Sequence, residues 1–260
     1  MRIAYVVTRA DAVGGASIHV RDLAREVLGT GHEAMVFVGG RGPVTAQLEA
    51  AGVPFHSLNH LMREIKPDAD IRAYFELSHA LRTWRPDLVS THTAKAGWLG
   101  RAAAARLGLP AIYTPHGWPI GDRISRAHGV IFTGAERLAA RWAAAIICVS
   151  ESERRLALAR RIAPPERLHV IHNGVRDSAL RGHPEVQPPR LVSVARFEAP
   201  KDHATLLRAL AELRDLEWGL DLVGEGPLEH ETTRLARVLG LADRVRFLGY
   251  RSDPAEILGA

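Results

Sequence analysis

Short apolar segments that alternate with helical patterns constrain the fold of this chain more than any other feature of its sequence. Residues 2–8 form an apolar run rich in β-branched residues, which predicts a buried strand. Apolar side chains then recur at the spacing of one helix face, at Val20, Leu23, Ala24, Val27 and Leu28. A second apolar run follows at residues 34–38, and the order strand, helix, strand predicts a parallel βαβ unit.

The same alternation continues along the chain. Further strands are predicted at residues 88–91, 111–114, 145–149 and 168–171. Helical patterns separate most of these strands, over residues 70–84, 94–107, 135–143 and 151–161. Glycine and proline are then frequent over residues 174–189, which indicates a linker between domains.

The pattern restarts after this linker. Strands are predicted at residues 191–195, 220–223 and 245–248, and helical patterns at residues 206–213, 227–239 and 254–258. The sequence therefore predicts an α/β protein with two Rossmann-like parallel-sheet domains, at residues 1–173 and 190–260. The second domain has few strands for a sheet of this class.

Composition and charge narrow the classes of function. The chain has 34 basic and 29 acidic residues, a formal net charge of +5 and a pI of about 9.9, which suits anionic partners such as nucleotides or lipid surfaces. We expect no nucleic-acid partner, because the sequence has no aromatic RNA-binding signature, zinc-finger spacing or basic zipper. The single cysteine, Cys148, excludes an internal disulfide framework and a multi-cysteine zinc site. No apolar stretch approaches the roughly 20 residues of a membrane span.

The loop after the first predicted strand contains Gly14 and Gly15. In an open parallel sheet, ligands bind at the carboxyl ends of the strands, and glycines there let backbone N–H groups approach a phosphate or hydroxyl. The alternative is an ordinary tight turn in which Ser17 caps the following helix. The loop lacks both G-x-G-x-x-G and Gly-Lys-Ser/Thr, which argues against a Rossmann oxidoreductase and a P-loop protein.

Two later loops carry polar side chains at the same kind of position. His116 lies just past a predicted strand, where an imidazole can donate to a substrate oxygen or stabilise developing charge. Arg196 and Lys201 lie between a strand and a helix that Asp202 is expected to cap, and two cations there suit a diphosphate. The alternatives are an ordinary loop histidine and a solvated surface pair.

Each of these segments is a weak signal alone, but their order and spacing resemble the retaining enzymes of glycosyltransferase family 4. The segments that carry the resemblance are residues 14–16 (GGA), 91–97 (THTAKAG), 115–117 (PHG), 149–152 (VSES), 170–175 (VIHNGV), Arg196 with Lys201, 224–227 (GEGP) and 245–250 (VRFLGY). Residues 91–100 are similar to those of members that build bacterial surface polysaccharide or exopolysaccharide. The resemblance implies the GT-B architecture, in which two Rossmann-like domains face each other.

The resemblance also implies roles for particular residues. A nucleotide-diphosphate sugar would lie mainly on the second domain, and a glycan or lipid-linked acceptor on the first. His116 would contact the transferred sugar, and Arg196 and Lys201 would neutralise the diphosphate. The donor-binding set implied is Gly15, Arg196, Lys201, Gly224, Glu225, Gly249 and Tyr250, and the acceptor-side loop set is Gly14, Gly15 and Lys95. No metal and no cofactor are implied, because the two cations take the place of a metal.

Three further expectations complete this interpretation. Members of the family continue with a Glu-x₇-Glu loop, so we expect the second domain to be incomplete and the chain to be truncated and weakly active or inactive. We expect a cytoplasmic protein with peripheral contact at the inner face of an anionic membrane, through mixed basic and apolar residues at 61–66 and 151–161. The alternatives are a solvated helix face, a non-catalytic nucleotide-sugar-binding remnant, and a sugar-nucleotide epimerase of the same fold.

Overall fold

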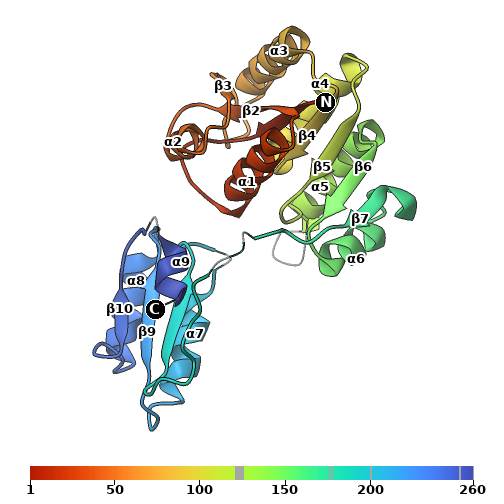
Figure 1. Ribbon diagram of the computed structural model, residues 1–260. Coiled ribbons are helices and arrows are strands. Elements are labelled where there is room, and N and C mark those ends of the chain that lie inside the picture. The colour runs from red at the N-terminus through yellow and green to blue at the C-terminus, as the bar shows by residue number, and fades with distance from the viewer. Residues whose placement is uncertain (121–125, 176, 178, 200, 252, 260) are drawn as a thin grey trace. The chain divides into compact units, whose positions relative to one another are not determined.

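The computed structural model describes residues 1–120, 126–175, 177, 179–199, 201–251 and 253–259. The chain divides into two compact units, unit 1 (Met1–Gly174) and unit 2 (Val175–Ala260). Each unit contains its own parallel sheet with helices packed against it, so the predicted α/β class is confirmed (Figure 1). Among the described residues, no helix is both long and apolar enough to cross a bilayer.

The sheet of unit 1 has seven parallel strands in the order β3-β2-β1-β4-β5-β6-β7. The strands are β1 (Arg2–Val7), β2 (Glu33–Gly39), β3 (Phe55–Leu58), β4 (Leu88–His92), β5 (Ala111–Thr114), β6 (Ala145–Cys148) and β7 (Leu168–Val170). The chain moves outward from β1 to β3 and then returns to the other side of β1. The carboxyl ends of β1 and β4 therefore border the crevice where sheets of this kind bind ligands.

The helices of unit 1 cover both faces of this sheet. They are α1 (Gly15–Gly29), α2 (Pro43–Ala50), α3 (Pro67–Trp84), α4 (Ala94–Arg106), α5 (Arg126–Ala139) and α6 (Glu151–Ala159), with short 3₁₀ turns at Ala140–Trp142 and Pro165–Arg167. Successive residues of β1 point to opposite faces. Ala4 and Val6 join the core under α3 and α4, whereas Tyr5 and Val7 join the core under α1 and α2.

Unit 2 contains a smaller sheet of the same type. Its strands β8 (Arg190–Val194), β9 (Gly219–Val223) and β10 (Val245–Phe247) pair in parallel in the order β10-β9-β8. Its helices are α7 (His203–Ala211), α8 (Glu229–Val238) and α9 (Pro254–Gly259). Asp221 on the central strand accepts paired hydrogen bonds from Arg190 and from Arg246 at 2.6–2.9 Å. These bonds, led by those from Arg246, hold the pKa of the Asp221 carboxyl well below its usual range.

Each predicted strand lies within one residue of an observed strand, but the helix predicted at residues 135–143 is α5, which begins at Arg126, and a strand and a helix of the described residues were not predicted. Neither β3 nor α2 was predicted. In β3 only Leu58 is fully buried, so the strand has no apolar run, and α2 is short. The apolar residues Leu156 and Leu158 of α6 pack against the core, and Leu61 is also buried, so these side chains are not offered to a membrane as expected.

A buried ion pair connects α4 to α5 above β5. The Arg101 guanidinium, which is fully buried, donates to Glu136 at 2.8 Å and to the carbonyl of Gly97 at 2.7 Å. Its carbon lies 3.8 Å from the ring centre of Tyr113 on β5. Burial, with Glu136 nearby, raises the pKa of the Tyr113 hydroxyl well above its usual value. The network thus holds two helices over the strand that leads to His116.

We expect Glu136→Ala to lower the free energy of unfolding by about 3–5 kcal/mol, because it leaves the Arg101 charge buried without its partner. Urea unfolding, together with hydrogen exchange of the α4 and α5 amides, measures the effect. Asp68→Ala is the control, since it removes the exposed pair with Arg72 on α3 and should leave the urea midpoint unchanged. Equal shifts in the two variants would contradict the role given to the buried pair.

Candidate functional site

The carboxyl ends of β1 and β4 are joined by side-chain hydrogen bonds. The hydroxyls of Thr8, after β1, and Thr93, after β4, lie 2.7 Å apart. The Thr8 hydroxyl also accepts from the N–H of Ala96 in the first turn of α4, at 3.1 Å. Thr93 has a positive φ of 69°, so the chain turns sharply between β4 and α4. These contacts fix the two loops that border the crevice.

Helix α1 begins in this crevice at Gly15, with Gly14 as its N-cap. The alternative in which Ser17 is the N-cap is wrong in position, because Ser17 is the third residue of the helix. The Ser17 hydroxyl instead accepts from the N–H of Gly14 at 3.0 Å and donates to its carbonyl at 2.9 Å. Gly14 and Gly15 are exposed, and nothing lies within 4 Å of where a Cβ on either would be. The first N–H groups of a helix lack partners within the helix, so this end can receive an anion or a hydroxyl.

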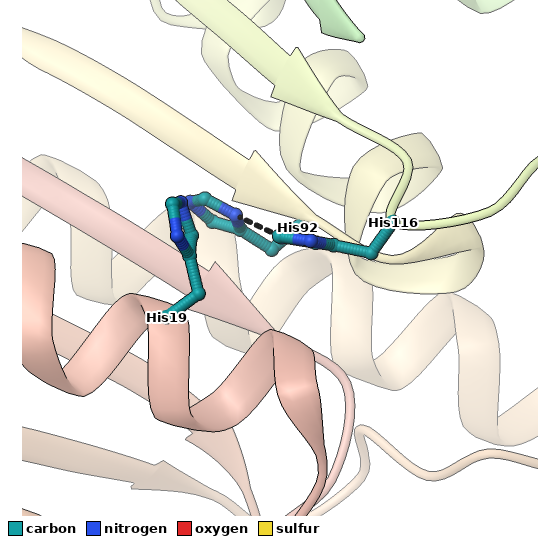
Figure 2. A group of neighbouring side chains, drawn as sticks. All are labelled: His19, His92 and His116. Carbon is teal, nitrogen blue, oxygen red and sulfur yellow. Dashed lines mark hydrogen bonds between the residues drawn. The ribbon is translucent and has the colours of Figure 1, made fainter. Parts of the chain in front are cut away.

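Three histidines from different elements meet at the same edge of the sheet (Figure 2). His92 is the last residue of β4, His116 follows the end of β5, and His19 comes from α1. Nδ1 of His92 and Nε2 of His116 form a hydrogen bond of 3.0 Å, and Nε2 of His92 bonds the Ser90 hydroxyl at 2.9 Å. The rings of His92 and His116 are stacked, and the rings of His19 and His116 meet edge to face.

Burial keeps these imidazoles uncharged. It lowers the pKa of His92 well below its ordinary value, and the neighbouring His116 and His19 lower it further. Burial and His19 lower the pKa of His116 to about 4. The pKa of His19 is also lowered by burial. At neutral pH the three rings can therefore donate and accept hydrogen bonds without carrying charge.

The three histidines also offer nitrogens that a metal ion can use. One nitrogen from each lies within 4.8 Å of the others. A tetrahedral zinc ion with bonds of about 2.0–2.1 Å needs its ligand nitrogens about 3.3 Å apart. Binding such an ion would also require the His92–His116 hydrogen bond to break. The arrangement as it stands is a hydrogen-bonded one.

His116 has a strained backbone, with a φ of 53° between Pro115 and Gly117. Residues with a side chain adopt this left-handed region at a cost, and such strain is typical of functional sites. The strain accompanies the placement of the ring against His92. The sequence predicted the position of His116 past the strand, and the structure places it at the crevice.

Lys95 lies in the first turn of α4, inside the helix predicted over residues 94–107, although it was grouped with the acceptor-side loop. Its ammonium pairs with Asp70 at 2.6 Å and donates to the carbonyl of Glu64. The Lys95 side chain is only 12% exposed. The charge of Lys95 thus links α4 to α3 and to the segment before α3.

In unit 2, Arg196 and Lys201 occupy one loop between β8 and α7. The loop is closed by backbone hydrogen bonds from Glu198 N–H to the Arg196 carbonyl and from Lys201 N–H to the Glu198 carbonyl. Asp202 caps α7 as predicted, since it accepts from the N–H of Thr205 at 3.0 Å. The Arg196 guanidinium pairs with the Glu198 carboxylate at 3.2 Å, a partner that the sequence did not reveal.

The loop after β9 lies against this Arg196 loop. Gly224 has a φ of 142°, and a Cβ there would lie 2.2 Å from the carbonyl oxygen of Ala195, so only glycine fits. The N–H of Gly224 donates to the Gly249 carbonyl at 2.8 Å. The N–H of Tyr250 lies 3.4 Å from the Glu225 carboxylate. Arg196, Gly224, Glu225, Gly249 and Tyr250 are therefore assembled at the carboxyl end of the second sheet.

A cavity of about 240 Å³ lies elsewhere in unit 2, between α7 and α8. Lys201 is the one predicted site residue among those that line it. The other donor-binding residues of unit 2, all of which the structure describes, do not line this cavity.

Sequence reasoning missed Ser90 and His92 as parts of the site. Ser90 lies within the strand predicted at residues 88–91, and His92 follows directly after it. The sequence does not show which side chains from other strands lie next to them. His19 was missed because it falls inside the helical pattern of α1. The available signal was that His92 and His116 each lie at the end of a predicted strand.

The relatives match between half and nearly all of the chain, and a solved structure matches nearly all of it. An Escherichia coli UDP-Gal:alpha-D-GlcNAc-diphosphoundecaprenol alpha-1,3-galactosyltransferase is 28% identical over 52% of this chain and 35% of that enzyme. The MMP alpha-(1->4)-mannosyltransferase of Mycolicibacterium hassiacum is 27% identical over 97% of this chain and 71% of that enzyme. The crystal structure of Anabaena HepE with UDP and glucose has a TM-score of 0.81 at 20% identity, over 99% of this chain and 71% of HepE. The chain thus spans 35% of the galactosyltransferase and 71% of the other two proteins.

Two family descriptions cover nearly all of the chain. Residues 177–260 match Glycosyl transferases group 1, and residues 13–179 match Glycosyltransferase Family 4. The latter match covers more than half of the sequence and includes all of the histidine site. With two Rossmann-like sheets and glycosyltransferases as its relatives, the chain belongs to glycosyltransferase family 4 and has the GT-B type of fold.

Proposed function

We propose that this protein transfers a sugar from a nucleotide-diphosphate sugar to a glycan or lipid-linked acceptor, with retention of configuration at the anomeric carbon. The observation that carries the proposal is the neutral His116, held by a hydrogen bond at the crevice of a family 4 sheet. Such a group can bond a sugar oxygen, and the exposed Gly14–Gly15 end of α1 beside the same sheet edge can receive an anion.

The donor class follows from the loops of unit 2. Arg196 offers a planar guanidinium and Lys201 a point charge, which together suit a diphosphate. HepE binds UDP and glucose, and the Escherichia coli relative uses UDP-Gal, which supports a nucleotide-diphosphate sugar as the donor. Gly224, Glu225 and the Gly249–Tyr250 segment would border the nucleotide.

The proposed chemistry is electrostatic. As the glycosidic bond breaks, negative charge grows on the leaving diphosphate, and fixed cations and N–H groups stabilise that growth more than they stabilise the ground state. Within unit 2, Arg196 and Lys201 would supply this stabilisation. We propose that no metal ion and no cofactor take part.

The acceptor is proposed from the relatives and from the surface of unit 1. The name of the Escherichia coli relative includes a diphosphoundecaprenol acceptor, which supports a lipid-linked acceptor and a role in cell-surface polysaccharide synthesis. The acceptor would lie near Gly14 and Gly15. Lys95 would help to position the acceptor side through its ion pair with Asp70 of α3.

We further propose that the protein works in the cytoplasm with peripheral contact at the inner face of the membrane. Ile65, Ile71 and Phe75 are 71%, 59% and 57% exposed, and Ile71 and Phe75 lie one turn apart on α3. Arg63 and Lys66 flank Ile65 in the sequence. Apolar and basic side chains so mixed suit an anionic lipid surface.

Arg196→Ala should reduce the rate of sugar transfer roughly 10²–10³-fold, as the loss of one preorganised charge does. We would measure UDP affinity by calorimetry and transfer from a radiolabelled nucleotide sugar. Arg237→Ala removes the same charge from an exposed position on α8 and should leave both values unchanged. A wild-type rate in Arg196→Ala would contradict the proposed donor site.

The transfer rate should be unchanged in excess EDTA, because the charges on the diphosphate are met by side chains and backbone N–H groups. The rate is measured with the dialysed enzyme with and without added Mg²⁺ or Mn²⁺. Loss of activity in EDTA that Mn²⁺ restores would rule out the metal-independent mechanism.

The pH profile should reflect the lowered pKa of His116, which is about 4. The neutral ring is the active form, so kcat/KM should show no His116-dependent change above about pH 5 and should fall as the ring becomes protonated below it. The profile of His116→Gln, at its lower rate, should lack that acid limb. A His116-dependent break near pH 6.5 would show that the ring is not held neutral in this way.

A further inference from the structure

The hydrogen-bond chain behind His116 has a direction that the structure determines. Ser90 and His92 occupy alternate positions of β4, so their side chains lie on the same face of the central strand. Ser90 bonds Nε2 of His92, and Nδ1 of His92 bonds Nε2 of His116. Ser90 and His92 are buried, with 2% and 1% exposure, so every polar hydrogen on these two side chains needs a protein acceptor.

Only one proton arrangement satisfies the buried donors of both Ser90 and His92. If the Ser90 hydroxyl donates to His92, then the neutral His92 ring carries its hydrogen on Nδ1 and donates it to Nε2 of His116. In the reverse arrangement His116 donates to His92 and His92 donates to Ser90. The hydroxyl hydrogen of Ser90 then has no acceptor among the hydrogen bonds of the described residues. A buried donor without an acceptor is unfavourable, so the first arrangement is preferred.

We propose that Ser90 and His92 are positioning residues that fix His116 in the tautomer with its hydrogen on Nδ1. Nε2 of His116 is then occupied as an acceptor, and Nδ1–H is the group that the ring can donate to a ligand. Among the described residues, no protein acceptor bonds Nδ1 of His116. The consequence for sugar transfer rests on the proposed function, whereas the tautomer itself does not.

The surroundings of the ring support a fixed orientation. The His116 ring stacks on His92 with centroids 5.2 Å apart and is met by the His19 ring at 5.1 Å. His116 and Gly117 both have a positive φ, of 53° and 105°, and this turn sets the direction in which the backbone presents the ring. Packing therefore limits how the ring can turn, and the Ser90–His92 chain decides which nitrogen carries the hydrogen.

Nitrogen-15 NMR of the histidine rings tests the proposal without any substrate. Long-range ¹H–¹⁵N spectra of the chain at pH 7 distinguish the two neutral tautomers. We expect His92 and His116 both to carry their hydrogen on Nδ1. This result would be distinctive, because a solvated histidine favours the hydrogen on Nε2. A wild-type His116 with its hydrogen on Nε2 would overturn the proposal, and this outcome depends on no variant.

Variants then separate positioning from simple packing. Ser90→Ala should let His116 populate both tautomers, and His92→Phe should return it to the Nε2–H form. His92→Asn should rescue the Nδ1–H form, because its amide can donate near the place of Nδ1. Ser78→Ala removes another buried hydroxyl, one that donates to the Tyr74 carbonyl within α3, and should change no histidine signal. An unchanged His116 tautomer in Ser90→Ala and His92→Phe would also overturn the proposed positioning role of Ser90 and His92.

The effect on catalysis provides a separate readout. In enzyme that transfers sugar, Ser90→Ala should lower kcat roughly 10- to 100-fold, as the loss of a partner behind a functional histidine does, with little change in donor KM. A normal kcat despite a changed tautomer would refute the catalytic consequence. If the wild-type protein shows the expected tautomer but transfers no sugar to any acceptor, the proposed function fails. The positioning of His116 by Ser90 and His92 is then still supported.

Discussion

The parallel pairing of β1 with both β2 and β4 is the constraint on which the rest of unit 1 depends. Because β1 lies between β2 and β4, the chain leaves it in one direction and returns on the other side, which separates the loops after β1 and β4. The register then aligns the strand ends, with Val7 beside His92 and His92 beside Thr114. His116, two residues past Thr114, can therefore reach His92 only in this register.

The elements were predictable because buried parallel strands are continuous apolar runs, and unit 1 has several. An edge strand such as β3 has one buried residue, so its signal is absent from the sequence. His116 was predictable from its place past a strand. The Ser90–His92 chain was not, because it depends on which strands are adjacent and on their register. Glu198 was missed because a local ion pair needs the turn geometry that only the fold supplies.

The degree of burial determines which ionisable side chains are charged in each unit. His92 is buried beside two other imidazoles, so desolvation and like-charge repulsion both oppose its protonation. The Arg196 side chain is 38% exposed and keeps its charge beside Glu198. An ion pair at such exposure is worth little, since water screens it. The proposed diphosphate could therefore replace Glu198 as the partner of Arg196 at small cost, whereas burial opposes a charge on His92.

Uncharged histidines in unit 1 and a charged arginine in unit 2 suit the chemistry of sugar transfer. The leaving diphosphate gains negative charge, while the anomeric carbon and ring oxygen gain positive charge in an oxocarbenium-like transition state. A protonated histidine next to the sugar would oppose that positive charge. A neutral ring such as His116 can hold a sugar oxygen through one N–H without this penalty, provided that the hydrogen lies on the correct nitrogen. In the proposed mechanism, the low pKa of His116 and its hydrogen bond with His92 would serve one requirement: an uncharged donor whose direction is fixed before the sugar arrives.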